Sequence, residues 1–186
     1  MTGTDIQQNK ITGKYILVFF IAVLLSWVFH ELAHVAAGEA LGYNMGMRLN
    51  SAFPTAGKYS EDIHYHLISA AGPLFTIMQA IVFFLLMYKK NKPGLYPFLF
   101  VCFYMRLLAT GISFFNPNDE ARISTALGLG KFTLPVIVTV ILFYMIYTIS
   151  KQYRFTKKFN LANFLLTMLF TSIIILSDQF FKIRIF

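Results

Sequence analysis

The motif His-Glu-Leu-Ala-His at residues 30–34 has the residue types and the spacing of a zinc-peptidase site. Residues four apart project from one face of an α-helix, so His30 and His34 can both reach one metal ion. Glu31 lies about 100° further round the helix, where its carboxylate reaches a metal-bound water rather than the metal. Zinc lowers the pKa of such a water to about 7, and a carboxylate base takes its proton as the water attacks a peptide carbonyl. The motif therefore predicts Zn²⁺ as cofactor and Glu31 as the base that activates the zinc-bound water.

This motif lies in a long apolar stretch, from Tyr15 to Ala40. Burying two imidazoles and a carboxyl group in such a helix costs several kcal/mol unless an ion or a partner compensates. The alternative, in which these polar side chains merely satisfy one another, is therefore the weaker interpretation.

A third metal ligand has to come from a polar segment at the same depth in the membrane. The third apolar segment ends on the same face as the motif, at Asn-Pro-Asn-Asp-Glu (116–120). We take Asp119 as the third ligand, with Glu120, His64 and His66 as the competing candidates. His64 and His66 are two apart and point in different directions on a helix, so we expect them at a loop edge. Four further residues are candidates for contacting the substrate, the oxyanion or the metal ligands: His64, His66, Asn116 and Glu120.

The 116–120 segment has a second, structural interpretation. Asn116, Pro117 and Asp119 also fit the N-cap, first residue and capping-box carboxylate of a short helix that ends near Gly128. Arg106 lies in mid-span, about 13 residues or roughly 20 Å of helix before Asp119. We expect Arg106 to pair with a buried carbonyl or to snorkel, and not to take part in catalysis.

Small residues mark the start of the second apolar segment, at Ser-Ala-Ala-Gly-Pro (69–73). They allow membrane helices to approach closely, and Pro73 frees the carbonyl four residues earlier. This stretch indicates either a kink packed against the metal-bearing helix or ordinary close packing.

The composition places the whole chain in a membrane. Of its 186 residues, 57% are hydrophobic and only 13% are charged, against about 25% charged in an average soluble domain. The net charge of +8 comes from short basic clusters between apolar runs, which favours anchoring to lipid headgroups over nucleic-acid binding. We therefore expect an all-α, multi-pass integral protein of the cell (plasma or inner) membrane. It is expected to form a single domain, 1–186, with about five spans at 15–40, 67–88, 95–115, 132–150 and 161–177.

The 42–62 connection carries the only strand signal. From Tyr43 to Leu49, apolar and polar residues alternate, which predicts a short strand after the first helix, broken by Pro54. The 16 Lys and Arg divide into nine on the N-terminal face, six on the opposite face and Arg106 within a span. That asymmetry favours a cytoplasmic N-terminus.

These elements together resemble the site-2 protease family of intramembrane metallopeptidases, over about residues 15–125. The resemblance rests on the 30–34 motif, on Ala-Gly-Pro at 71–73 and on the Asn-Pro-x-Asp element at 116–119. It implies a three-helix catalytic core with zinc held by His30, His34 and Asp119, and a strand-forming 42–62 segment that holds an extended substrate. The additional helices, about 132–177, lie outside it. Asn-Asp-Glu at 118–120 replaces the family's usual Leu-Asp-Gly, which leaves both Asp119 and Glu120 open as ligands.

The predicted function is that of a zinc metalloendopeptidase that cleaves membrane-associated polypeptides. Its substrate must be locally extended, because the hydrogen bonds of a helix shield the peptide bond. The Tyr43–Leu49 strand is a candidate edge for β-addition of that substrate. The predicted partners are thus a membrane-protein or peptide substrate and the lipid bilayer, without nucleic acid. Two alternatives remain: a non-proteolytic zinc-binding or regulatory membrane protein, and, less favoured, an ion transporter, whose polar path should continue across the midplane.

Overall fold

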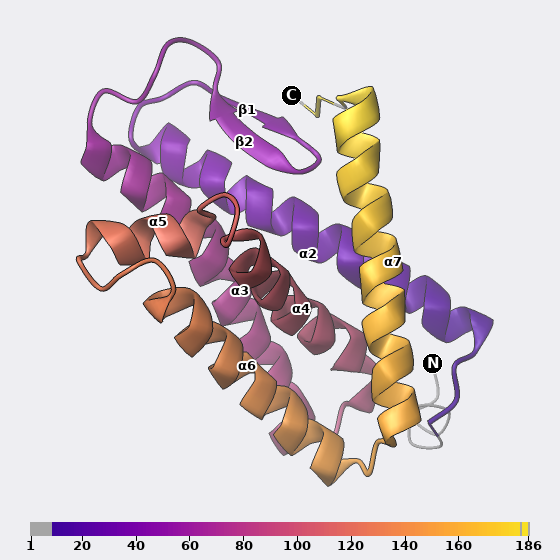
Figure 1. The fold of residues 1–186 in the computed structure, drawn as a ribbon. Helices are drawn as coiled ribbons and strands as arrows, with labels where there is room; N and C mark the ends of the chain where they lie inside the picture. The colour runs from indigo at the N-terminus through magenta and orange to yellow at the C-terminus, as the bar shows by residue number, and fades with distance from the viewer. Residues whose placement is uncertain (1–8, 183, 186) are drawn as a thin grey trace.

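Five helices form the bulk of the protein in a computed structural model that describes residues 9–182, 184 and 185 (Figure 1). Within the described residues, these five are long and apolar enough to cross a membrane, as the five apolar segments predict. They are α2 (Gly13–Ala40), α3 (Asp62–Lys90), α4 (Tyr96–Ile112) with the preceding 3₁₀ turn η1 (Pro93–Leu95), α6 (Thr133–Gln152) and α7 (Lys157–Phe181).

Local sequence signals set the helix ends. The Thr12 side chain caps α2 by accepting from the Tyr15 backbone N–H at 3.2 Å, and the chain leaves α2 through Gly42, whose φ is +86°. Helix α3 begins five residues earlier than its apolar segment, at Asp62, because an acidic residue is favourable in the first turn of a helix. His64 and His66 consequently lie within α3 and not at a loop edge.

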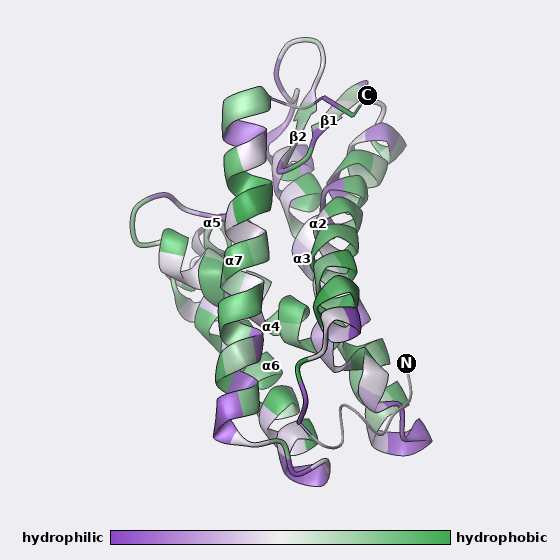
Figure 2. Cartoon of the chain, turned by 90° about the vertical axis from the view of Figure 1, so that its right-hand side faces the viewer, coloured by the Kyte–Doolittle hydropathy of each residue, from purple (hydrophilic) through white to green (hydrophobic). Residues whose placement is uncertain are grey.

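The basic segments gather at one end of the bundle. The Asn9 side chain accepts from the Thr156 backbone N–H at 2.8 Å, which joins the N-terminal segment to the α6–α7 connection. Gln152 donates to the Tyr88 carbonyl at 3.3 Å, which joins that connection to the end of α3. Hydrophilic residues accordingly concentrate near the helix ends, whereas the helix centres are hydrophobic (Figure 2).

A β-hairpin follows α2, where a single strand was predicted. Strand β1 (Met45–Arg48) pairs antiparallel with β2 (Ser51–Pro54). The alternating pattern located β1, but β2 has no such alternation and ends in a proline, so it was missed. The Ile185 backbone N–H donates to the Met47 carbonyl at 2.9 Å, and Arg184 forms a bridge with Arg48. Strand β1 therefore lies between β2 and the C-terminal residues, over the C-terminal half of α2 (Figure 1).

The helices beyond the three-helix core belong to the same packing unit. Helix α7 crosses α2 in Figure 1, and the buried Asn163 of α7 accepts a hydrogen bond from the Tyr15 hydroxyl of α2. Polar contacts of this kind hold membrane helices together. Asp178 at the end of α7 accepts from the Leu49 backbone N–H at 3.2 Å. The resemblance places 132–177 outside the core, but α7 both packs on α2 and fastens the hairpin.

Candidate metal centre

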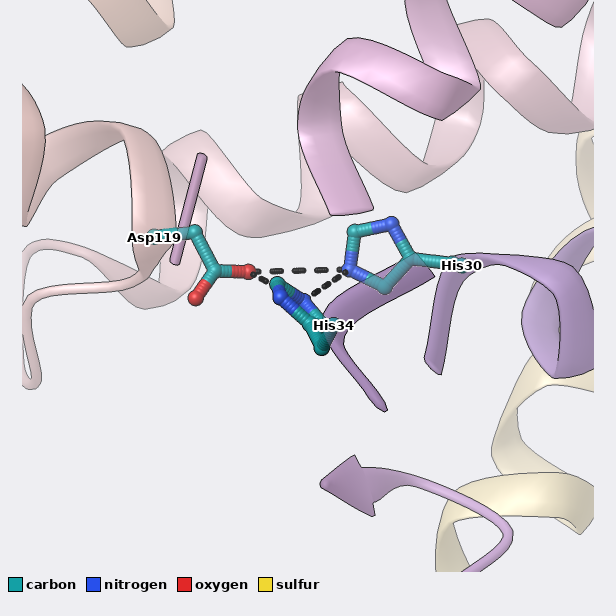
Figure 3. A group of neighbouring side chains, drawn as sticks. All are labelled: His30, His34 and Asp119. Carbon is teal, nitrogen blue, oxygen red and sulfur yellow. Dashed lines mark hydrogen bonds and ion pairs between the residues drawn. The ribbon is translucent and has the colours of Figure 1, made fainter. Parts of the chain in front are cut away.

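Three ligand atoms from two distant helices converge in the interior (Figure 3). His30 Nε2 lies 3.2 Å from His34 Nε2. Asp119 Oδ2 lies 3.5 Å from His30 Nε2 and 3.4 Å from His34 Nε2. Among the described residues, these three form a group that can hold a metal ion, and all three are buried.

The outer nitrogen of each imidazole is already engaged, which assigns both tautomers. His34 Nδ1 lies 2.6 Å from the Ile68 carbonyl, which can only accept, so Nδ1 carries the proton. The Thr76 hydroxyl donates to the Gly72 carbonyl at 3.1 Å, so it accepts from His30 Nδ1 at 3.0 Å. Both Nε2 atoms are left as lone-pair acceptors pointing at one another and at the Asp119 carboxylate.

This arrangement fits a tetrahedral divalent cation. Three acceptors that face each other in a buried site repel, and a proton on one nitrogen relieves only part of that repulsion. A central cation relieves all three contacts at once. Zinc bonds of about 2.0–2.1 Å in a tetrahedron separate their ligand atoms by roughly 3.3–3.4 Å, close to the 3.2, 3.5 and 3.4 Å observed.

Gly72 provides the space in which the two imidazoles meet. A Cβ atom at this position would lie 2.3 Å from His34 Nε2 and 2.5 Å from His30 Cε1. Helix α3 therefore passes directly against the ligand atoms at Gly72. It remains helical through Pro73, the next residue. The small-residue stretch thus packs closely against α2. Both of its interpretations include this packing, and the kink at Pro73 stays a prediction.

A cavity of about 600 Å³ opens beside the three ligands. Glu31 is 6% exposed and lines this cavity together with His30 and His34. Trp27 forms part of the wall one turn earlier in α2, and its indole N–H donates to the Asn50 side chain at 2.6 Å. Ser51 and Ala52 of β2 also face the cavity, and so do Ile175 and Gln179 of α7. A carboxylate, a candidate metal site and a strand edge therefore share one enclosure.

The structure separates the two acidic candidates for third ligand. The short helix α5 (Asp119–Ala126) begins with Asn118 as its N-cap, two residues after the predicted Asn116. Its first residue, Asp119, faces the histidines, whereas the next residue, Glu120, is turned about 100° round the helix. Glu120 Oε1 instead lies 3.2 Å from Arg106 Nη1.

Arg106 is close to the α5 carboxylates because the chain reverses direction after α4. The Ser113 hydroxyl accepts from the Asn118 backbone N–H at 3.2 Å and closes this turn. The expected separation of roughly 20 Å between Arg106 and Asp119 assumed that the helix continues, and it is wrong. The expectation that Arg106 pairs with a buried carbonyl or snorkels is also wrong. Arg106 is 3% exposed, lines the cavity and pairs with Glu120, which is 4% exposed.

The surroundings of the two acidic groups act on their pKa values in opposite directions. Burial raises the pKa of the Asp119 carboxyl. When an imidazole of the metal-free site is protonated, it donates from Nε2 to this carboxylate and favours its ionised form more strongly than burial opposes it, so the pKa of Asp119 lies well below the usual range. Burial raises the pKa of Glu120, and the Arg106 guanidinium opposes but does not cancel that effect. Of the two carboxyl groups, Asp119 is therefore the one that more readily stays ionised.

We expect the Arg106–Glu120 pair to contribute to stability only as a pair. Arg106→Leu or Glu120→Leu alone leaves one buried group without its counter-charge, which costs about 3–5 kcal/mol, and the double variant should recover most of this loss. Unfolding of the metal-free protein in detergent micelles measures the effect. Additive losses in the double variant would show that the two side chains act independently.

The remaining candidates lie at different distances from the centre. Asn116 lines the cavity, whereas neither His64 nor His66 belongs to its wall. His64 Nδ1 lies 2.8 Å from the Tyr43 hydroxyl, and His66 Nδ1 is buried without a hydrogen-bond partner in the described part of the chain. The interpretation of these two histidines as substrate or oxyanion contacts gains no support from their positions.

The sequence pattern missed the groups that orient the imidazoles. Thr76 stands four residues after Gly72, so both lie on the face of α3 that meets the motif, and that spacing was an available signal. The Ile68 carbonyl had no signal, because any backbone carbonyl carries a second lone pair.

Comparison with protein-family models, curated proteins and solved structures finds no match to this chain. Its function therefore has to be read from the geometry and chemistry of the site itself.

Proposed function

We propose that this protein is a zinc metalloendopeptidase of the site-2 protease type, which hydrolyses peptide bonds of membrane-associated polypeptides. The supporting observation is the convergence of three acceptor atoms, from His30, His34 and Asp119, beside a buried carboxylate at a cavity wall. The setting is a multi-pass membrane protein, and the plasma or inner membrane is the proposed location.

His30, His34 and Asp119 would hold the zinc ion. Zinc supplies Lewis acidity there, since it lowers the pKa of water that it binds and polarises a peptide carbonyl. The Thr76 hydroxyl and the Ile68 carbonyl keep both Nε2 atoms unprotonated and aimed at the centre. Asp119 brings one negative charge, which partly offsets that of a divalent ion.

Glu31 is the proposed proton carrier. It follows the first histidine in α2 and lines the same cavity, but it is not one of the three converging groups. Its carboxylate takes a proton from the attacking water and delivers it to the leaving amine.

The strand that holds the substrate is β2 rather than the Tyr43–Leu49 segment. Strand β1 has β2 on one side and residues 184 and 185 on the other. Ser51 and Ala52 of β2 line the cavity, and among the described residues no further strand lies along the outer edge of β2. An extended polypeptide added there runs past the metal centre with its peptide groups hydrogen-bonded to β2.

The experiment that tests this function is metal-dependent cleavage by the purified, reconstituted protein. We expect about one zinc per chain, and cleavage of at least one polypeptide from a panel of single-span membrane proteins in the same vesicles. A zinc chelator should stop the cleavage, and added Zn²⁺ should restore it. His34→Ala should lose both zinc and cleavage.

Three outcomes would overturn the proposal in different ways. Zinc binding without cleavage of any panel member indicates a metal-binding or regulatory protein. Zinc-dependent ion flux across the vesicle membrane, without proteolysis, indicates a transporter. Cleavage that persists in the chelated protein would rule out the proposed mechanism.

A further inference from the structure

The guanidinium of Arg122, on α5, lies against one oxygen of the third ligand. Arg122 Nη2 donates a hydrogen bond to Asp119 Oδ1. The other oxygen, Oδ2, is the one that lies 3.5 Å from His30 Nε2 and 3.4 Å from His34 Nε2. The two oxygens of the Asp119 carboxylate therefore have different neighbours: Oδ1 accepts from Arg122, and Oδ2 faces the candidate metal centre.

Three further contacts fix the plane of this guanidinium. Arg122 Nη2 also donates to the Ser69 hydroxyl at 3.3 Å, and Nη1 donates to the Pro117 carbonyl at 3.2 Å. The guanidinium carbon lies 5.3 Å from the centre of the Tyr65 ring. Tyr65 and Ser69 belong to the face of α3 that continues to Gly72, against the imidazoles. One side chain thus ties the orientation of Asp119 to the helix that packs on both histidines.

We propose that Arg122 is a positioning residue that makes Asp119 a one-oxygen ligand, which rests on the zinc-peptidase function proposed above. A carboxylate free to rotate can bind a cation through both oxygens and so take up one more coordination position. A catalytic zinc site needs that position for water or substrate. By holding Asp119 Oδ1, Arg122 keeps that coordination position open. The planar, forked guanidinium suits this role, because it can hold Asp119, Ser69 and Pro117 at the same time.

The direction in which zinc affinity changes when Arg122 is replaced distinguishes a positioning role from a purely electrostatic one. Arg122 is a cation close to the ligand group, so its charge alone weakens zinc binding, and its removal should tighten binding. Orientation acts in the opposite direction, because loss of a group that orients a metal ligand weakens binding by about 10- to 100-fold.

The experiment measures the zinc affinity of the full-length protein by competition with a chromophoric chelator. We expect Arg122→Gln to bind zinc about 10- to 100-fold more weakly. Arg122→Lys should fall between this variant and wild type, because one ammonium group cannot replace the fork. Lys90→Gln, which removes an exposed charge at the far end of α3, is the matched control and should bind as wild type does.

A double-mutant cycle tests whether Arg122 acts through Asp119. In an Asp119→Ala background, Arg122→Gln should no longer weaken the residual zinc binding by the two histidines. Cobalt substitution gives a second readout that a purely structural role would not change. Tetrahedral Co²⁺ absorbs visible light far more strongly than five-coordinate Co²⁺, so the band of the wild-type protein should weaken in Arg122→Gln as Oδ1 becomes a ligand.

The outcomes distinguish this inference from the function on which it rests. If the wild-type protein binds no zinc, both are wrong. If wild type binds zinc and Arg122→Gln binds it equally or more tightly, the positioning role alone is wrong. An equal loss of affinity in the presence and absence of Asp119 would also overturn it, because the arginine would then act elsewhere.

Discussion

We expect Glu31→Gln to retain its zinc and to lose peptide cleavage. The three converging ligand atoms belong to other residues, so the amide should leave metal content nearly unchanged. Glutamine has the shape of glutamate but cannot accept the proton of the attacking water. General-base catalysis contributes about 10²- to 10⁴-fold, so we expect the cleavage rate to fall by at least that range. Zinc content by elemental analysis and cleavage of the reconstituted panel substrate are measured on the same preparation.

Glu39→Gln is the matched control for this variant. Glu39 lies on the same helix but is exposed and does not line the cavity, so its amide should cleave at the wild-type rate. A Glu31→Gln protein that still cleaves would exclude Glu31 as the base. If zinc is lost together with activity, Glu31 is instead needed for metal binding.

Gly72→Ala is expected to abolish metal binding through a single added methyl group. Alanine in a helix is favoured over glycine by about 1 kcal/mol, so propensity alone predicts a more stable α3. The added Cβ, however, would lie 2.3 Å from His34 Nε2 and 2.7 Å from His30 Nε2. Neither ring can withdraw without breaking its hydrogen bond to the Ile68 carbonyl or to Thr76. The ligand atoms must separate, and zinc content and cleavage should fall together.

Gly111→Ala controls for the general effect of a methyl group on a membrane helix. Gly111 lies near the end of α4, and an added Cβ there meets no atom within 4 Å. This variant should keep its zinc and its activity. Full zinc occupancy in Gly72→Ala would contradict the close approach of α3 to the imidazoles, and with it the assigned ligand geometry.

Helix periodicity explains which parts of the site were predictable. His30 and His34 come together because residues four apart share one face of a helix, and that relation needs no knowledge of the fold. The choice between Asp119 and Glu120 is different, because both follow the same turn at the same depth. It depends on where α5 begins, and Asn118 rather than Asn116 caps that helix. A shift of two residues rotates every side chain by about 200°.

The contact of Arg106 with Glu120 and the existence of β2 could not be predicted from the sequence for a related reason. Arg106 meets Glu120 only because the chain turns back at Ser113, and no periodicity encodes a reversal between two helices. Strand β2 exists because β1 offers it a partner, and a strand of four residues has too little pattern of its own. Spans and ligand spacing are local properties, whereas these contacts depend on the tertiary fold.

Because Trp27 lines the cavity and contacts Asn50, its intrinsic fluorescence can report on the cavity. Trp27 is the only tryptophan in the sequence. It lies in the cavity wall, and its indole N–H donates a hydrogen bond to Asn50, one of the two residues between β1 and β2. Its emission therefore reports on one place in the molecule, the junction of the hairpin with α2. If a polypeptide adds along β2 as proposed, it should change the polarity around that indole. Binding of the proposed substrate should thus be measurable by fluorescence in the unlabelled, wild-type protein.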